Sequence, residues 1–184
     1  MLRNTETAWG TIAKLLHWGI AVLIVAQIVL GLVAIGWRLS PTKLNLFIWH
    51  KSLGILLLAL IAARLLWRFA NPTPRLPADM PGWERLAAHA SHALLYICMF
   101  ALPVSGWIIN SAANVPLRVF WLFPLPPITA PDKALAETMK LVHLGLIVAL
   151  GVVLAIHVAA ALRHHFIKRT DILLRMLPGR SPTP

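Results

Sequence analysis

The sequence has little charge, few acidic residues and almost no cysteine, and each shortage excludes a class of protein. Charged residues make up 12% of the 184 positions, whereas an ordinary soluble domain carries roughly 25%. Hydrophobic residues make up 59% of the chain. This balance indicates a helical membrane protein, and a chain of this length has room for a single bundle.

The shortage of cysteine limits the cofactor chemistry. Cys98 is the one cysteine, so no disulfide can form within the chain. The sequence Cys-x-x-Cys-His is absent, which excludes covalent attachment of a c-type haem. Near the N-terminus, residues 15–37 form one long uncharged stretch with no small-residue cleavage site. We therefore interpret this stretch as a retained membrane span rather than a signal peptide.

Uncharged apolar stretches predict four membrane-spanning helices. Each stretch is long enough to cross about 30 Å of hydrocarbon, and backbone groups in lipid must be paired within their own segment, which requires helices. The predicted fold is an all-α integral membrane four-helix bundle that forms one domain over residues 1–184. The expected spans are about 14–36, 45–67, 88–110 and 140–163, followed by a cytoplasmic tail over 164–184.

The distribution of basic residues predicts the orientation of the bundle. The net charge of +11 is compatible with nucleic-acid binding, but the basic residues flank the apolar runs instead of forming one patch, so no nucleic-acid partner is expected. More of them lie on the side of the termini, and the positive-inside rule therefore places both termini in the cytoplasm. The eleven on that side are Arg3, Lys14, Arg64, Arg68, Arg75, Arg85, Arg163, Lys168, Arg169, Arg175 and Arg180, and the six on the other side are Arg38, Lys43, Lys51, Arg118, Lys133 and Lys140.

Four histidines lie near the ends of the predicted spans, at two depths. His143 and His157 are fourteen positions apart, which on a helix is about 21 Å of rise and about −40° of rotation. They therefore share one helix face, with one imidazole near each side of the bilayer. Ionisable side chains at membrane depth are costly and usually functional. Paired histidines with almost no carboxylate nearby point to haem iron rather than to proton transfer.

Sorting the histidines by depth predicts their pairing. A six-coordinate haem needs one histidine on each face of its ring, from different helices. On the outer side this leaves His50 with His143. On the inner side several pairs are open, and His17 with His157 is favoured because both lie inside the apolar zone. The other inner histidines are His89, His164 and His165, which are expected at the interface, and His92, whose role stays open.

The interval of fourteen residues recurs on the other helices. It joins His17 to Gly31, His50 to Arg64, and His92 to Gly106. We expect all these residues to face the bundle axis. The two glycines would then leave room for the outer macrocycle, although small residues in membrane helices also serve helix packing.

Two basic side chains are candidates for pairing with haem propionates. Arg64 is placed to face the inner haem. Lys51 directly follows His50 and is the candidate on the outer side, although a lysine there could instead extend to the membrane interface.

Several short motifs give the chain a resemblance to a known family. In this order and spacing, the chain resembles the bacterial cytochrome b561 family, four-helix di-haem proteins of the inner membrane. The resemblance covers nearly the whole chain. The matching stretches are Leu16-His17-Trp18, Trp49-His50-Lys51-Ser52, Arg64-Leu-Leu-Trp-Arg68, Pro72-Thr-Pro74, His92-Ala-Leu-Leu-Tyr96, Leu102-Pro-Val-Ser-Gly106, His143, His157 through Ala161, His164-His165-Phe166 and Leu174-Arg-Met176.

The resemblance implies a function and a set of ligands. It implies two non-covalent haem b groups, with His17, His50, His143 and His157 as axial ligands to iron. It also implies a multi-pass protein of the bacterial inner membrane, in contact with lipid, that exchanges electrons with ubiquinone or menaquinone. One similar protein oxidises superoxide at the periplasmic face, so a superoxide:quinone oxidoreductase is one expectation here.

The expected electron path runs from a donor on the outer side to a quinone on the inner side. The donor would meet the outer haem near Lys51 and the loop 111–139, and quinone would lie near His92, Arg64 and His89. A rival reading is a haem-bearing membrane anchor for a dehydrogenase or hydrogenase-type partner protein. A proton channel or transporter is disfavoured because the predicted spans contain no Asp or Glu. A metal carrier using the same histidines would differ by its absorption spectrum.

Overall fold

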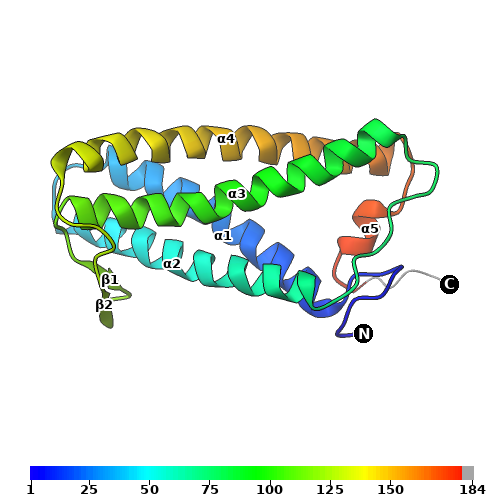
Figure 1. The fold of residues 1–184 in the computed structure, drawn as a ribbon, viewed down its shortest axis with the longest axis horizontal. Coiled ribbons are helices and arrows are strands. Elements are labelled where there is room, and N and C mark those ends of the chain that lie inside the picture. Colours follow the sequence, from blue (N-terminus) through cyan, green and yellow to red (C-terminus); the bar gives the residue numbers. More distant parts are fainter. Residues whose placement is uncertain (180–184) are drawn as a thin grey trace.

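Four long helices dominate the computed structural model, which describes residues 1–179 (Figure 1). Each helix is long and apolar enough to cross a membrane. The predicted four-helix membrane bundle is thereby confirmed. The last five residues of the predicted tail, Arg180 among them, lie outside the described residues. The helices are α1 (Thr11–Gly36), α2 (Pro41–Phe69), α3 (Gly82–Ala112) and α4 (Lys133–Phe166).

All four helices begin before the expected spans, and polar side chains cap the starts of two of them. At the start of α2, the Ser40 hydroxyl accepts a hydrogen bond from the Lys43 amide, and Pro41 occupies the first turn. At the start of α4, the Asp132 carboxylate accepts one from the Leu135 amide at 3.1 Å. Caps of this kind satisfy amides that have no partner within the helix. Helices α2 and α4 can therefore begin a turn or more before the expected spans.

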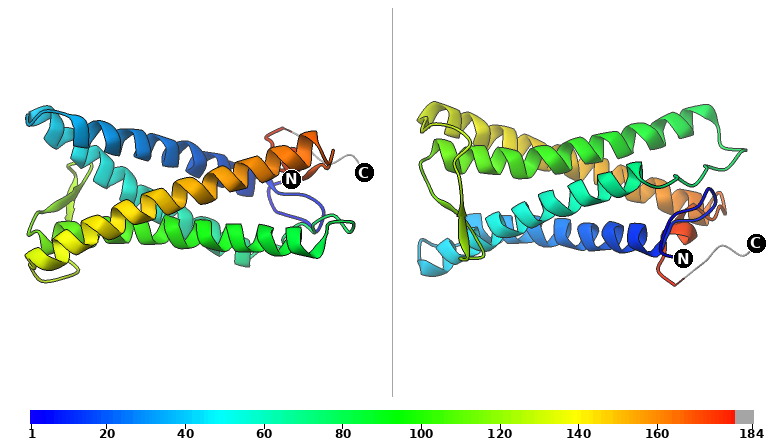
Figure 2. Two further views of the ribbon diagram at one scale, coloured as in Figure 1. Left: turned by 90° about the horizontal axis from the view of Figure 1, so that it is seen from above. Right: turned by 60° about the horizontal axis from the view of Figure 1, so that its bottom comes forward.

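The bundle consists of two helix pairs joined along one seam. Helix α1 packs along α2, α3 packs along α4, and α2 against α3 links the pairs (Figures 1 and 2). The N-terminal residues lie at the same end as the short helix α5 (Ile172–Met176), which we call the α5 end. The opposite end, which we call the hairpin end, carries the α1–α2 and α3–α4 connections. Both helix pairs therefore run from the α5 end to the hairpin end, and these two ends would face opposite sides of a membrane.

A short antiparallel hairpin occupies part of the α3–α4 connection, which the sequence predicted only as a loop over 111–139. It is formed by β1 (Leu117–Val119) and β2 (Phe123–Leu125), with Leu117 opposite Leu125. Its turn residues Phe120 and Trp121 have φ angles of 47° and 61°. Bulky residues rarely adopt this left-handed conformation, and the sequence contains no Asn-Gly or similar turn signal at this point. The hairpin was therefore not apparent from the sequence.

Contacts with the start of α2 hold the hairpin turn in place. The fully buried Ser52 hydroxyl accepts a hydrogen bond from the Phe120 amide at 2.7 Å and bonds the Arg118 carbonyl at 3.3 Å. The Trp49 ring packs edge-on against Phe120 and Trp121, with centroid distances of 5.6 and 5.4 Å. The residues on either side of His50 and Lys51 thus anchor the hairpin end.

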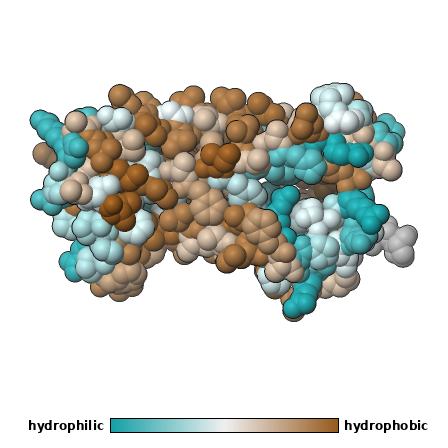
Figure 3. Space-filling model, in the orientation of Figure 1, coloured by the Kyte–Doolittle hydropathy of each residue, from teal (hydrophilic) through white to brown (hydrophobic). Residues whose placement is uncertain are grey.

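The surface of the bundle matches a membrane environment. An apolar band covers the middle of the molecule, and polar residues gather towards the two ends (Figure 3). Large side chains such as Val22, Leu32, Val148 and Ile156 are more than half exposed. A monomeric soluble protein rarely exposes a continuous apolar area of this extent. Lipid is therefore the solvent for this band.

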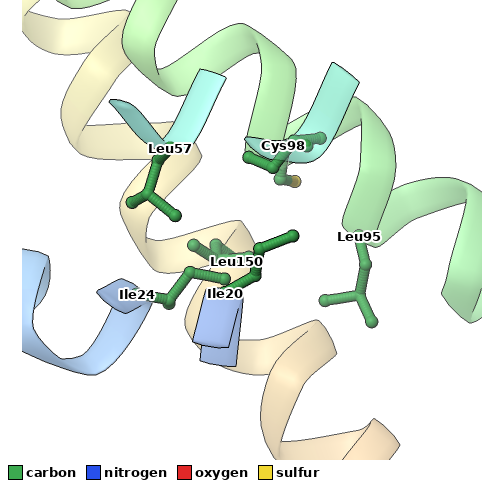
Figure 4. Close-up of a cluster of buried hydrophobic side chains, with 7 residues drawn as sticks. Ile20, Ile24, Leu57, Leu95, Cys98 and Leu150 are labelled. Atoms are coloured by element: carbon green, nitrogen blue, oxygen red, sulfur yellow. The ribbon is translucent and has the colours of Figure 1, made fainter. Parts of the chain in front are cut away.

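A compact apolar core lies midway along the bundle. Its side chains come from all four helices (Figure 4). Along each helix, the core residues lie between the two positions of its fourteen-residue interval. The core therefore separates the hairpin end from the α5 end. The buried members are Ile20, Ile24, Leu57, Ile61, Leu95, Cys98 and Leu150.

The α5 end is closed by a cluster of charges around one buried acid. The Glu84 side chain is 5% exposed and accepts from Arg163 at 3.0 Å, with Lys168 at 3.2 Å and His164 at 3.4 Å. Glu84 lies in the first turn of α3, and its partners lie in the last turn of α4 or just after it, so the cluster ties these two helix ends together. Glu84 lies before the predicted span 88–110, so it adds no acid within the hydrocarbon.

Candidate functional site

Two imidazoles at the hairpin end lie directly against glycines on neighbouring helices. A Cβ atom placed on Gly31 of α1 would be 3.0 Å from Cε1 of His50 on α2. A Cβ atom on Gly106 of α3 would be 3.7 Å from Cε1 of His143 on α4. The two predicted outer histidines and the two glycines of the fourteen-residue intervals therefore meet at one level. Gly31 is the tighter position, because any side chain there would displace the His50 ring.

A serine that the sequence reasoning did not single out fixes the His143 ring. The Ser105 hydroxyl lies 2.9 Å from Nδ1 of His143 and donates to the Leu102 carbonyl at 2.8 Å. A hydroxyl has one proton to donate, so when Ser105 donates to Leu102 its oxygen can only accept from His143. Ser105 is 4% exposed. The only signal in the sequence was its position inside the Leu102–Gly106 motif.

His50 has a different environment, shaped by a glutamine in the middle of α1. The Gln27 amide donates to the His50 backbone carbonyl at 2.7 Å and packs beside Gly54. The ring atom Nδ1 of His50 and the Oε1 atom of Gln27 are both buried, and neither has a hydrogen-bond partner among the described residues. The Gln27 backbone carbonyl interacts with the His50 ring. Gln27 was missed because a single glutamine in an apolar run has no motif around it.

Three histidines from three helices gather near the α5 end. The ring centroids of His17 and His157 are 6.4 Å apart. His92 packs edge-on against His157 with a centroid distance of 5.2 Å. The favoured inner pair is thus brought together, and His92 joins it. Among the described residues, no group of three or more His, Cys, Asp and Glu side chains has the geometry of a site for a free metal ion.

The predicted basic partners lie close to these histidines. The Arg64 guanidinium donates to the Ala13 carbonyl at 3.1 Å, which links α2 to α1. It is near enough to His17 and His157 to interact with both electrostatically. Lys51 is half-buried at the hairpin end, directly after His50.

The remaining histidines lie away from both levels. His89 is exposed. His164 belongs to the cluster around Glu84, and His165 packs against Phe166 with a centroid distance of 4.7 Å. The predicted interfacial place of these residues is consistent with their positions near the ends of α3 and α4.

Comparison with protein families decides which group of membrane proteins has this arrangement. The family model described as prokaryotic cytochrome b561 matches residues 8–179. The chain belongs to the prokaryotic cytochrome b561 family. As the resemblance in the sequence implied, this is a multi-pass protein of the bacterial inner membrane. Membership also implies a b-type haem and transfer of electrons across the membrane.

Individual relatives are similar to the cytochrome over most of its length. It is 37% identical to cytochrome b561 homolog 2 of Escherichia coli strain K12, over 97% of this chain and 95% of that protein. Cytochrome b561 homolog 1 of the same organism is 32% identical, over 90% of this chain and 94% of that protein. A probable superoxide oxidase CybB of Yersinia pestis is 34% identical, over 71% of this chain and 74% of that protein.

The donor set of this cytochrome fits a b-type haem chemically. Imidazole is a ligand of haem iron. Gly31 leaves room for the His50 ring itself, whereas a Cβ atom on Gly106 would make an ordinary contact with the His143 ring. The unpartnered Nδ1 atom of His50 also marks this level as one where protein atoms do not satisfy every polar group.

Proposed function

We propose that this cytochrome b561 carries electrons across the membrane through two haem b groups, one at each histidine level. His50 and His143 would hold the haem at the hairpin end, and His17 and His157 the haem near the α5 end. Each haem supplies a one-electron carrier when bound. The protein's part is to hold the two carriers at fixed depths on either side of the apolar core.

The spacing of the imidazoles at the α5 end supports this assignment. Bonds from imidazole to first-row metal ions are about 2.0 Å long, so two imidazoles on opposite sides of one iron have ring centroids about 6 Å apart. His17 and His157 are 6.4 Å apart, which fits. His92 and His157, at 5.2 Å, are too close to hold an iron between them. His92 is therefore proposed as a neighbour of the ligand and not as a ligand.

We also propose that the α5 end faces the cytoplasm. Eleven of the seventeen Lys and Arg residues were assigned to this side of the spans and six to the other, and the positive-inside rule then sets the orientation. Electrons would enter from the periplasm at the hairpin end and leave towards the cytoplasmic side.

Superoxide is the proposed donor, and the hairpin end is the place where it would arrive. One relative, from Yersinia pestis, is described as a probable superoxide oxidase. Lys51 beside His50, and Arg118 on the hairpin held by Ser52, provide positive charge at this end. Positive charge attracts an anionic substrate and raises its rate of association.

A membrane quinone is the proposed acceptor at the α5 end. Arg64 and His92 lie beside the His17 and His157 pair, and an open cleft of about 520 Å³ lies between the N-terminal residues, Ile12 and Trp67. Ile12 is about 1.4 turns of α1 from His17, so the cleft lies at the same end of the bundle as the haem proposed there. His89 is exposed and is the weakest of the predicted quinone contacts.

The test is whether the purified protein couples the two half-reactions alone. Haem reduction by superoxide, followed by reoxidation on addition of ubiquinone or menaquinone, is the expected result. If superoxide leaves the haems oxidised, and the protein co-purifies from membranes with another redox subunit that does reduce them, the protein is instead the haem-bearing anchor of a larger complex.

A further inference from the structure

We propose that Ser105 is a positioning residue for the haem at the hairpin end, because its hydroxyl fixes the His143 ring with Nε2 free to bind iron. This inference rests on the proposed ligation by His143. It adds a residue outside the ligand set, and it predicts that the two ligands of that haem differ in their electronic character.

The tautomer of His143 follows from the direction of two hydrogen bonds. The Ser105 proton is donated to the Leu102 carbonyl at 2.8 Å, so the Ser105 oxygen can only accept from His143 Nδ1 at 2.9 Å. The Ser105 contact therefore requires a proton on Nδ1, which leaves the lone pair of the neutral ring on Nε2.

The orientation of the ring agrees with this assignment. Of the His143 ring atoms, Cε1 and Nδ1 are the two within 4 Å of a Cβ position on Gly106. The Nδ1–Cε1 edge therefore faces α3, and Nε2 is farther from it. No hydrogen bond within residues 1–179 uses Nε2 of His143. The free nitrogen is thus available to a ligand in the interior of the bundle.

The two proposed ligands at the hairpin end are held unequally. Metal-bound histidines commonly donate their second N–H to a fixed acceptor, which orients the ring and raises its basicity. His143 has such an acceptor in the buried Ser105 hydroxyl. Nδ1 of His50 has no side-chain acceptor within the described chain, and the Gln27 backbone carbonyl interacts with this ring instead. The His143 side should therefore contribute most of the hydrogen-bond tuning of this haem.

The same helix offers a matched control for the loss of a serine. Ser91 on α3 donates to the Ala88 carbonyl at 3.0 Å, three residues earlier, as Ser105 donates to Leu102. No hydrogen bond in the described part of the chain joins Ser91 to an imidazole. Ser91→Ala therefore removes the same kind of hydroxyl-to-backbone bond without touching a proposed ligand. Ser105→Thr retains the hydroxyl and serves as the conservative variant.

The experiment is a redox titration of the purified, haem-loaded protein with spectra recorded at each potential. A weaker hydrogen bond on Nδ1 makes the imidazole a poorer donor to ferric iron, so Ser105→Ala should favour the ferrous form of one haem. We expect the ferric-to-ferrous ratio at a given potential to fall about tenfold, which is about 59 mV for a one-electron couple. The second haem of Ser105→Ala should keep the midpoint potential of the parent. Both haems of Ser91→Ala and of Ser105→Thr should do so as well.

Each outcome bears on the proposal. Loss of one haem in Ser105→Ala, with retention in Ser105→Thr, would also support it. Two haems with unchanged potentials in Ser105→Ala would overturn it, as would an identical change in Ser105→Thr. A parent protein that binds no haem would instead refute the proposed function, and haem content measured before the titration separates the two failures.

Discussion

The two histidine levels of this cytochrome are built differently, although they lie in one bundle and share helix α4. At the hairpin end, each imidazole has a glycine opposite it, and a hydroxyl fixes one of the rings. Near the α5 end, three imidazoles lie together beside an arginine, and no glycine is in contact with them. At the hairpin end, close contacts with neighbouring helices define the positions of two imidazoles. Near the α5 end, a third imidazole, that of His92, lies beside the pair.

The two levels can therefore be tuned in different ways. At the hairpin end, contacts to the His50 and His143 rings set the position of these rings, so Ser105 and Gly31 should control haem binding there. Near the α5 end, Arg64 places positive charge beside the rings, and positive charge near iron favours the reduced state. The α5 level should therefore be suited to receiving the electron, which agrees with the proposed direction of transfer.

Replacing one ligand at a time should give the largest effect. His50→Ala and His157→Ala should each lose one of two haems, because iron then lacks one of its two axial bonds. Haem extraction and the reduced minus oxidised spectrum of each variant measure this loss. Retention of both haems in His50→Ala would show that the hairpin level is not the site described here, while His92→Ala, which removes the spare imidazole, should keep both.

Filling the space beside the His50 ring at the hairpin end should come next in size. Gly31→Leu would force atoms into the space of the His50 ring, since even a Cβ would lie 3.0 Å from it. Overpacking of this kind costs about 1–3 kcal/mol, and we expect the hairpin-level haem to be lost or its spectrum to shift. Gly145→Leu is the control, because a Cβ there meets nothing within 4 Å. A normal haem spectrum in Gly31→Leu would show that the glycine serves helix packing only.

Weakening the charge cluster should affect the stability of the α5 end more than its haem. Glu84→Gln leaves Arg163 and Lys168 without a carboxylate partner, and loss of one member of a buried charge network is destabilising. The melting temperature in detergent should fall by several degrees while the haem spectra stay unchanged. Glu137→Gln, which removes an exposed partner of Lys140, is the control and should have little effect. Equal melting temperatures for the two variants would show that Glu84 does not stabilise the contact between α3 and α4.

The smallest effect is expected from the glutamine beside His50. Gln27→Leu removes the donor to the His50 carbonyl and also removes the unpartnered Oε1 atom. These two contributions oppose each other, so stability should change by no more than about 1 kcal/mol. A small shift of the hairpin-level spectrum is expected, since one hydrogen bond between α1 and the His50 backbone is lost. A large loss of stability would mean that Gln27 Oε1 has a partner, such as a buried water.

Much of the fold could be predicted because lipid imposes simple rules. Uncharged stretches of membrane length must be helical, and the interval of fourteen from His50 to Arg64 or from His143 to His157 needs only helix geometry. The elements outside the bilayer could not be predicted in the same way. The hairpin turn at Phe120 and Trp121 has no turn residues, and its conformation depends on contacts with Trp49 and Ser52 from another helix.

Some residues of the candidate site could likewise be predicted from the sequence, and others could not. The positions of His17, His50, His143 and His157 followed from depth, because histidine in an apolar run is conspicuous. Ser105 and Gln27 were missed because serine and glutamine are unremarkable in a sequence, and their importance comes from which neighbour each one meets after folding. Glu84 was missed because it precedes the uncharged stretch, while its partners come from the far end of α4.

The most direct measurement is the haem content of the purified protein, by pyridine haemochrome assay against protein concentration. We expect about two b-type haems per chain, with two resolved midpoint potentials. A folded preparation that is colourless, or that binds a single haem when haem is in excess, would contradict it.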